Sequence, residues 1–212
     1  GADRTLTTQM KSVGETMAIG RTFKEALQKA VRGLETGRVG MGLDPRDPAE
    51  ILAEDPSALT RTLRVPNEHR LLALRVAYKA GWSTQDIHEA SRIDPWFLEN
   101  IRELVDFESE LSGALLTKEL LLEAKRLGYS DRQIALAAGS SEHDVTALRE
   151  DLGIRPTYKL VDTCAAEFEA ATPYYYSTWE DENEYRPGPK PRVMILGGGP
   201  NRIGQGIEFD YC

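Results

Sequence analysis

The residues best suited to chemistry lie near the end of the chain, in a glycine-rich run from Gly197 to Gly206. Successive glycines let backbone N–H groups approach an anion at the start of a helix, so the run has the composition of a phosphate-binding loop. Its spacing differs from the common motifs, because a dinucleotide fingerprint needs glycine where Arg202 stands and a P-loop needs a following lysine. Tight packing of a strand against a helix is the favoured explanation, and nucleotide binding is the alternative.

The other reactive side chains form no complete active site in the sequence. Glu208 and Asp210 follow the glycine-rich run, but two carboxylates at this spacing are a weak signal for a catalytic pair. Cys164 has Asp162 near it and no basic residue placed to activate the thiol. Three histidines are far apart and lack metal-ligand spacing: His69, His88 and His143. We therefore expect no catalytic, cofactor-binding or metal-binding residue in this chain.

The overall charge argues against several classes of partner. The 212 residues carry 34 acidic and 26 basic side chains, a formal net charge of −8, and an isoelectric point of about 5.1. Binding to nucleic acid or to an anionic membrane needs clustered lysine and arginine, so we expect neither partner. The two cysteines, Cys164 and Cys212, form no disulfide framework, which favours a reducing, cytoplasmic compartment.

The first segment with a clear helical pattern starts at Thr22, which is expected to cap the helix, with Gly37 as its stop. Apolar residues recur on one face of this segment: Phe23, Ala26, Leu27, Ala30, Val31 and Leu34. Residues 37–48 are rich in glycine and proline and are interpreted as a connector, with a boundary near Asp44. From about residue 48 to 155 the pattern predicts an all-α block.

Helix ends within this block follow ordinary signals. An Asp-Pro pair at Asp94 predicts the start of a helix, because aspartate caps well and proline suits the first position. Helices over about 66–80 and 117–127 are expected to end at Gly81 and Gly128, because glycine takes the left-handed conformation that often follows a helix.

The block also contains an internal repeat, in which residues 79–87 align with residues 126–134. In each copy a serine, Ser83 or Ser130, is expected to cap a short helix in a capping-box pattern, and a longer helix follows. The outline is that of two helix-turn-helix-like units, so DNA binding is an alternative. Residues 81–104 and 128–151 each contain five acidic and two basic side chains, however, which favours helical packing over contact with phosphates.

The pattern changes after residue 155. Residues 172–179 are aromatic and β-prone, residues 180–184 form an acidic run interpreted as solvated surface, and residues 186–191 form a stiff linker, with a boundary near residue 184. Val193–Leu196 is predicted to be the first strand of an α/β domain, leading into the glycine-rich turn. Because the chain begins with Gly1 and stops before the expected next helix, we expect it to be a piece of a larger protein.

Four segments carry a resemblance to a known family: residues 7–21, 161–168, 174–178 and 197–212. Together they resemble, in the same order, the large subunit of carbamoyl phosphate synthetase. Thr16 is a small departure, because an apolar residue is expected there.

The resemblance implies a division of the chain. Residues 1–43 would be the tail of the first, carboxyphosphate-forming ATP-grasp half. Residues 44–184 would be the helical oligomerisation domain, and residues 185–212 would begin the second, carbamoyl phosphate-forming half. The expected fold class is therefore mainly α, with the end of one ATP-grasp half and the first strand and glycine-rich turn of the next domain attached.

The resemblance also implies a reaction for the parent protein. That ligase makes carbamoyl phosphate from bicarbonate, glutamine-derived ammonia and two ATP, with Mg or Mn, for arginine and pyrimidine synthesis. Its implied partners are other copies of the large chain and a glutamine amidotransferase small subunit. The 212 residues alone are expected to be inactive; the alternative is a stand-alone helical scaffold or a helix-turn-helix DNA-binding module.

Three residues match positions that the resemblance associates with a passage for carbamate between the two sites: Met17, Gly206 and Glu208. Such a passage would be needed because carboxyphosphate and carbamate hydrolyse quickly in water, so the path must be enclosed. Ordinary packing at a domain junction is the alternative role for these residues.

Overall fold

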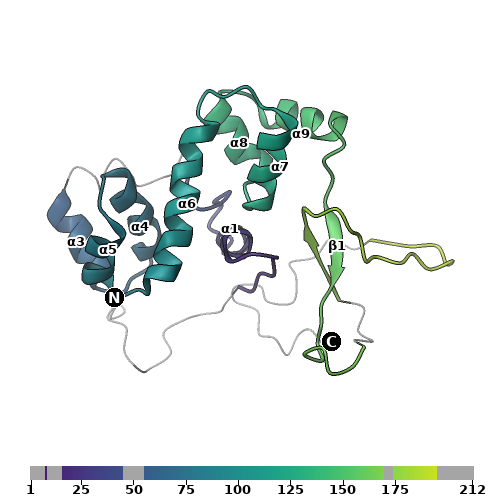
Figure 1. Cartoon of the computed structure of the whole chain (residues 1–212), viewed down its shortest axis with the longest axis horizontal. Helices are drawn as coiled ribbons and strands as arrows, with labels where there is room; N and C mark the ends of the chain where they lie inside the picture. Colours follow the sequence, from purple (N-terminus) through teal and green to yellow (C-terminus); the bar gives the residue numbers. More distant parts are fainter. Residues whose placement is uncertain (1–7, 9–15, 45–54, 170–173, 195–212) are drawn as a thin grey trace.

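The computed structural model describes residues 8, 16–44, 55–169 and 174–194, which form eight helices and two short strands (Figure 1). The helices are α1 (Phe23–Gly33), α3 (Pro56–Arg64), α4 (Arg70–Lys79), α5 (Thr84–Ser91), α6 (Pro95–Leu111), α7 (Lys118–Arg126), α8 (Asp131–Ala138) and α9 (Glu142–Asp151), and the strands are β1 (Thr157–Leu160) and β2 (Tyr175–Thr178). The mainly α fold predicted from the sequence is confirmed. None of the described helices is long and apolar enough to cross a membrane.

Helix α6 is the centre of the fold. In Figure 1 it stands between α3, α4 and α5 on one side and α7, α8 and α9 on the other, and it contacts helices of both groups. Five of its aliphatic side chains are buried: Leu98, Ile101, Leu104, Val105 and Leu111. Each side chain of this kind contributes about 1.5–3 kcal/mol when fully buried, so α6 stabilises both groups of helices.

Most of the predicted helix ends are confirmed. Thr22 caps α1 by accepting from the N–H of Glu25, and Asp94 caps α6. Helix α1 ends at Gly33 rather than near Gly37, because Glu35 already has a positive φ of 55°. Helix α4 begins four residues after the predicted Pro66, at Arg70, since residues 66–69 form a turn held by the side chain of Asn67.

The predicted repeat appears as two units with the same order of elements. Helices α5 and α8 each begin with a complete capping box, formed by Ser83 with Asp86 and by Ser130 with Gln133. Each ends at a left-handed residue, Arg92 or Gly139, before α6 or α9 begins. The further interpretation of these units as helix-turn-helix modules stays a prediction.

The loop after α1 is exposed at residues 34–37 and buried at residues 40–42 and 44, within the segment for which a connector was predicted. Met41 is fully buried, its N–H donates to Oε1 of Gln28 at 2.7 Å, and Nε2 of Gln133 donates to the carbonyl of Gly42 at 2.9 Å. The two glutamines satisfy backbone groups that would otherwise be buried without partners. Met41 and Val31 belong to the same core as the helices after residue 55. The domain boundaries near residues 44 and 184 stay predictions.

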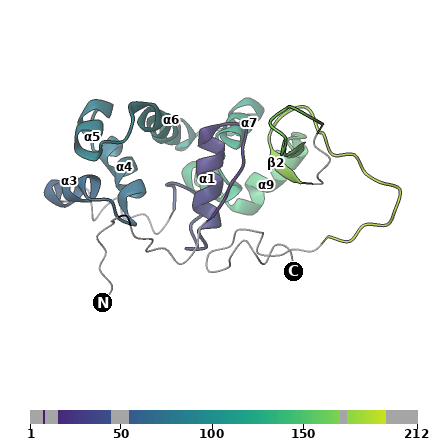
Figure 2. The ribbon, with the colours of Figure 1, turned by 90° about the horizontal axis from the view of Figure 1, so that it is seen from below.

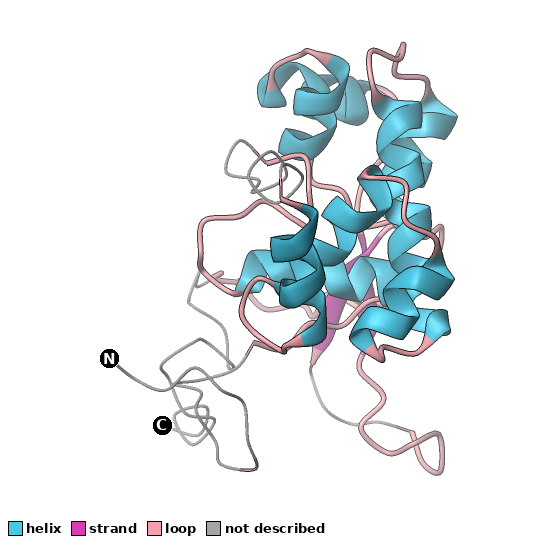
Figure 3. Cartoon of the chain, turned by 90° about the vertical axis from the view of Figure 1, so that its left-hand side faces the viewer, coloured by secondary structure: helices cyan, strands magenta, loops and turns pink. Residues whose placement is uncertain are grey.

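The two strands form an antiparallel hairpin whose register pairs Thr157 with Thr178 and Leu160 with Tyr175. Figure 2 and Figure 3 show this hairpin beside the helical body. Hydrogen bonds of Lys29 and Glu25 join it to α1. The β-prone character of residues 172–179 is confirmed by β2, whereas β1 was not predicted.

The predicted strand at Val193–Leu196 is not present in the part of it that the structure describes. Val193 and Met194 belong to no strand and are highly exposed. A strand needs a neighbour to pair its backbone N–H and C=O groups, and no described residue pairs with these two. Residues 195–212, with the glycine-rich run, lie outside the described residues.

Candidate functional site

Glu25 is a buried carboxylate in the first turn of α1, and it connects two distant parts of the chain. Its Oε2 accepts hydrogen bonds from the N–H of Arg21 at 2.7 Å and from Oγ1 of Thr178 in β2 at 3.1 Å. Its Oε1 forms an ion pair with Nζ of Lys29 at 3.0 Å. The residue is only 1% exposed, and a carboxylate at such a site needs this set of partners. A Cβ on Gly20 would lie 2.9 Å from Oε2, so the approaching chain is closely packed here.

Lys29 extends the same connection. Its Nζ donates to the carbonyl of Ile19 at 2.8 Å and to the carbonyl of Ser177 in β2, and it lies 5.9 Å from the ring centroid of Tyr176. Glu25 and Lys29 are one helical turn apart and therefore lie on one side of α1. Both residues hold the segment that enters α1 against β2.

Residues 179–184, which follow β2 and which we call the arm, place three glutamates near Lys159 in β1. Glu180, Glu182 and Glu184 lie 3.9, 3.2 and 3.4 Å from Nζ of Lys159 in β1. Burial alone lowers the pKa of Lys159, but hydrogen bonds to Glu182 and Glu184 outweigh it and raise that pKa. The acidic run was predicted to be solvated surface, and residues 181–184 are exposed. Its glutamates also pair with Lys159, whose side chain is buried on the inner face of the hairpin.

Trp179 docks the arm onto α7 and α9. Two cations lie near its ring, with Nζ of Lys125 at 4.7 Å and the guanidinium of Arg149 at 5.2 Å from the centroid. Asp131 pairs with both cations, at 2.7 Å from Lys125 and 3.0 Å from Arg149. Burial would raise the pKa of Asp131, but the charge of Lys125 and hydrogen bonds from Lys125, Arg149 and Thr146 hold that pKa below its usual value. Arg126 donates to the carbonyl of Trp179 at 3.1 Å.

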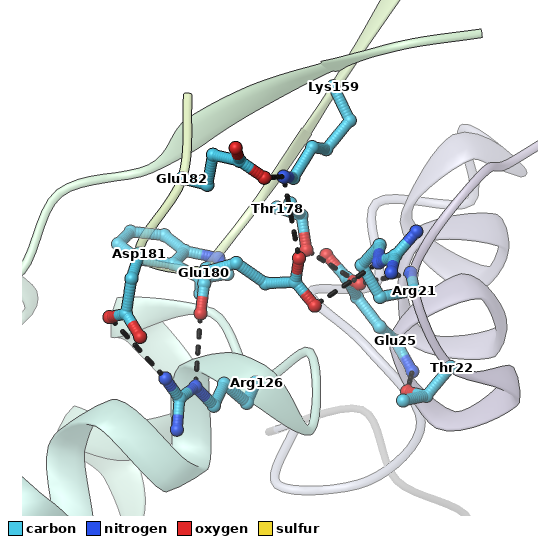
Figure 4. Close-up of a pocket in the computed structure, with 10 residues that line it drawn as sticks. Arg21, Thr22, Glu25, Arg126, Lys159, Thr178, Glu180, Asp181 and Glu182 are labelled. Carbon is cyan, nitrogen blue, oxygen red and sulfur yellow. Dashed lines mark hydrogen bonds and ion pairs between the residues drawn. The ribbon is translucent and has the colours of Figure 1, made fainter. Parts of the chain in front are cut away.

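We call the set Arg21, Glu25, Lys29, Thr178 and Glu180 the polar junction; Figure 4 shows all of these residues except Lys29. Nε of Arg21 lies 3.1 Å from Oε1 of Glu180, so this ion pair also joins the entering segment to the arm. A cavity of about 500 Å³ lies at the junction. The two carboxylates of the junction are both paired with cations, an arrangement that fastens segments together. The described residues contain no group of three or more side chains suited to a metal ion.

The predicted passage residues are only partly within the described structure. Met17 lies in the segment just before the polar junction and is 60% exposed. Gly206 and Glu208 lie outside the described residues, so their relation to Met17 stays a prediction. Cys164 is a free, half-buried thiol, and Nδ1 of His88 bonds to the carbonyl of Ile93.

Comparison with known protein families identifies the family of this chain. A family model described as the carbamoyl-phosphate synthetase large chain, oligomerisation domain, matches residues 15–153. The chain belongs to this family. A second model, described as the carbamoyl phosphate synthase preATP-grasp domain, matches residues 189–212. The oligomerisation-domain match starts before α1 and therefore includes the entering segment of the polar junction.

Individual relatives agree with the family. The chain is 56% identical over 215 residues to the carbamoyl phosphate synthase large chain of a Nostoc strain and 53% identical over 218 residues to that of Archaeoglobus fulgidus. It is 57% identical over 215 residues to the arginine-specific, chloroplastic large chain of rice. Each match covers 100% of this chain but only 18–20% of the relative. The chain thus spans about a fifth of the length of these relatives. Their names favour the predicted relation to the synthetase large chain over a stand-alone scaffold.

The polar junction was not predicted as a unit from the sequence. Its members are an ordinary helical Glu-Lys pair, an arginine, a threonine in an aromatic stretch and one glutamate of an acidic run. One signal was present, because two of the five residues end motifs on which the family resemblance rests: Arg21 is the last residue of the motif at 7–21, and Thr178 is the last residue of the motif at 174–178.

Proposed function

We propose that this chain is the central segment of a carbamoyl phosphate synthase large chain. The helical body would mediate self-association of large chains, and the polar junction would hold the strips that lead into and out of it. The observation that carries the proposal is the hydrogen bond from Thr178 to buried Glu25, which fastens the strand leading to residues 189–212 onto the helix entered from residues 15–22. The match to a preATP-grasp domain at residues 189–212 supports the assignment of that strip to the next catalytic half.

In this proposal the whole protein is an ATP-dependent ligase. It would form carbamoyl phosphate from bicarbonate, ammonia and two ATP with Mg or Mn, and a glutamine amidotransferase subunit would supply the ammonia. The printed name of the rice relative supports a role in arginine synthesis, and pyrimidine synthesis is part of the same proposal. Residues 1–43 would end the first ATP-grasp half, and the protein would work in the cytoplasm, although the rice relative is named as chloroplastic.

The test compares the full-length large chain with the 212-residue chain. With bicarbonate, ammonia and MgATP, the full-length chain should form carbamoyl phosphate, and the 212-residue chain should hydrolyse no ATP. ATP turnover by the 212-residue chain, or no product from the full-length chain, contradicts the proposal. Light scattering over a concentration series tests self-association, which should be seen as a rise in mass with concentration.

The proposed passage has its own test in the full-length chain. Met17→Trp should narrow a path lined by Met17, Gly206 and Glu208, so that overall synthesis falls while bicarbonate-dependent ATP hydrolysis persists. Met10→Trp, in the same N-terminal segment, is the matched control. An equal loss of both activities in Met17→Trp would indicate a packing role instead.

A further inference from the structure

The outer face of the hairpin is rich in exposed tyrosine. In the antiparallel register Tyr158 lies opposite Ser177 and Leu160 lies opposite Tyr175, so these four residues share one face. Tyr158 is 43% exposed and Tyr175 is 39% exposed. The ring of Tyr185 packs edge-on against Tyr175, with centroids 5.8 Å apart, and it is also 39% exposed. We call Tyr158, Leu160, Tyr175 and Tyr185 the tyrosine face.

The opposite face of the same hairpin is already occupied. Lys159 and Thr178 point to that inner face and are buried by the arm and by α1. A two-stranded sheet is marginally stable unless something packs against it, and the inner contacts supply that packing on one face. Tyrosine offers a large, rigid surface at low entropic cost and is enriched at interfaces, which makes the outer face suited to a protein partner.

The chain that follows the hairpin is fixed beside this face. Residues 183–185 run along the free edge of β1: the N–H of Glu184 donates to the carbonyl of Tyr158 at 2.9 Å, and Oδ1 of Asn183 accepts from the N–H of Tyr158 at 3.1 Å. Oε2 of Glu184 accepts from the N–H of Leu160 at 2.7 Å. These bonds act as a partial third strand, so the chain leaves the hairpin at Tyr185.

Residues of the matched preATP-grasp segment begin four positions after Tyr185, at residue 189. Four residues span at most about 14 Å, so that segment must start close to the tyrosine face. One of its residues already touches the face: Nη1 of Arg192 donates to the hydroxyl of Tyr185 at 2.6 Å, and its guanidinium lies 5.9 Å from the ring centroid. A short tether gives a high effective concentration, so even a weak contact would be populated.

We propose that the tyrosine face is the docking surface for the preATP-grasp domain that begins at residue 189 of the same chain. The inference rests on the proposed function, because it requires that domain to be complete in the full-length protein. Arg192 makes the first contact, and the rings of Tyr158 and Tyr175 form the centre of the interface.

The test is hydroxyl-radical footprinting, read by mass spectrometry, of the 212-residue chain and of the full-length large chain. Oxidation of Tyr158 and Tyr175 should fall about fivefold in the full-length chain, as expected when exposed rings enter the core of an interface. Tyr185→Ala in the full-length chain should restore their oxidation, and Arg192→Gln should restore it in part. Tyr174→Ala is the matched control and should leave the protection unchanged. Tyr174 is also exposed, but because it directly precedes Tyr175 in the alternation of side chains it does not share the tyrosine face.

Equal oxidation in the two wild-type chains would overturn the proposal. Protection that appears in the 212-residue chain as its concentration rises would also overturn it, because a second copy would then be the occupant. Carbamoyl phosphate formation is measured on the same full-length preparation. An active enzyme with unprotected tyrosines refutes the docking surface alone, whereas an inactive enzyme with protected tyrosines refutes only the proposed function.

Discussion

Oγ1 of Thr178 donates a hydrogen bond to Oε2 of Glu25 across a sequence separation of 153 residues. The bond joins the inner face of the hairpin to the buried side of α1. Two further polar links lie beside it: Lys29 donates to the carbonyl of Ser177, and Arg21 forms an ion pair with Glu180. Polar contacts therefore contribute to the docking of the hairpin.

Thr178→Val should loosen this docking. The substitution keeps the shape of the side chain and removes the hydroxyl, so a buried carboxylate loses one donor, at a cost of about 1–3 kcal/mol. Native-state hydrogen exchange of residues 157–160 and 175–178 measures that loss as faster opening of the hairpin. Ser177→Ala, at an exposed side chain on the opposite face of β2, is the control and should leave the exchange unchanged. Equal rates in the two variants would show that the Thr178 hydroxyl contributes nothing.

The parts of the fold that the sequence predicted are those that depend on residues close together in the chain. The caps at Thr22 and Asp94 and the capping boxes at Ser83 and Ser130 are local hydrogen bonds, and the residue types that make them are few. The family resemblance likewise rested on contiguous motifs.

The parts that were missed depend on contacts between distant residues. The apolar pattern located α1, but its most deeply buried side chains are Glu25, Gln28 and Val31. Glu25 and Gln28 are buried because the hairpin and the loop containing Met41 bring backbone and hydroxyl groups that need polar partners. The sequences of the loop and of the hairpin do not indicate that these segments pack against α1. The pattern of hydrophobicity along α1 therefore does not reveal that buried polar side chains are needed on it.

Gly42→Ala should destabilise the fold strongly. Gly42 has a φ of 92°, and a Cβ there would lie 2.1 Å from Nε of Arg75 and 2.5 Å from Oε1 of Glu108, both of which are buried. Backbone strain and displacement of a buried ion pair together should cost about 3 kcal/mol or more in urea unfolding. Gly81→Ala is the matched control, because Gly81 has a similar φ of 84° but nothing within 4 Å of a Cβ. Its cost should be about 1 kcal/mol, from the left-handed backbone alone. Similar losses in both variants would contradict the packing of the loop on Arg75.

Glu108→Gln should also be costly. Glu108 accepts from Nε and Nη2 of Arg75 at 2.6 Å each and pairs with Lys79 at 2.7 Å, and its side chain is buried. Removing one charge from a buried pair leaves the guanidinium uncompensated, at a cost of about 3–5 kcal/mol in the free energy of unfolding. Glu99→Gln, in the exposed pair with Arg102, should cost about 0–1 kcal/mol. If the two variants unfold at the same urea concentration, the buried ion pair contributes no more to stability than the exposed one.

Asp131 should make stability depend on pH in the acid range. Pairing with Lys125 and Arg149 holds its pKa in the folded state below the unfolded value of about 3.9. The unfolded state therefore binds the proton more readily, so the contribution of Asp131 is complete above about pH 5 and is lost as pH falls through the folded pKa. Asp131→Asn should lower the free energy of unfolding at pH 7 and approach the wild type at the lowest pH. Asp151→Asn, at an exposed carboxylate, is the control and should follow the wild-type profile throughout. A constant difference between Asp131→Asn and the wild type from pH 7 to pH 2 would show that Asp131 acts through packing and not through its charge.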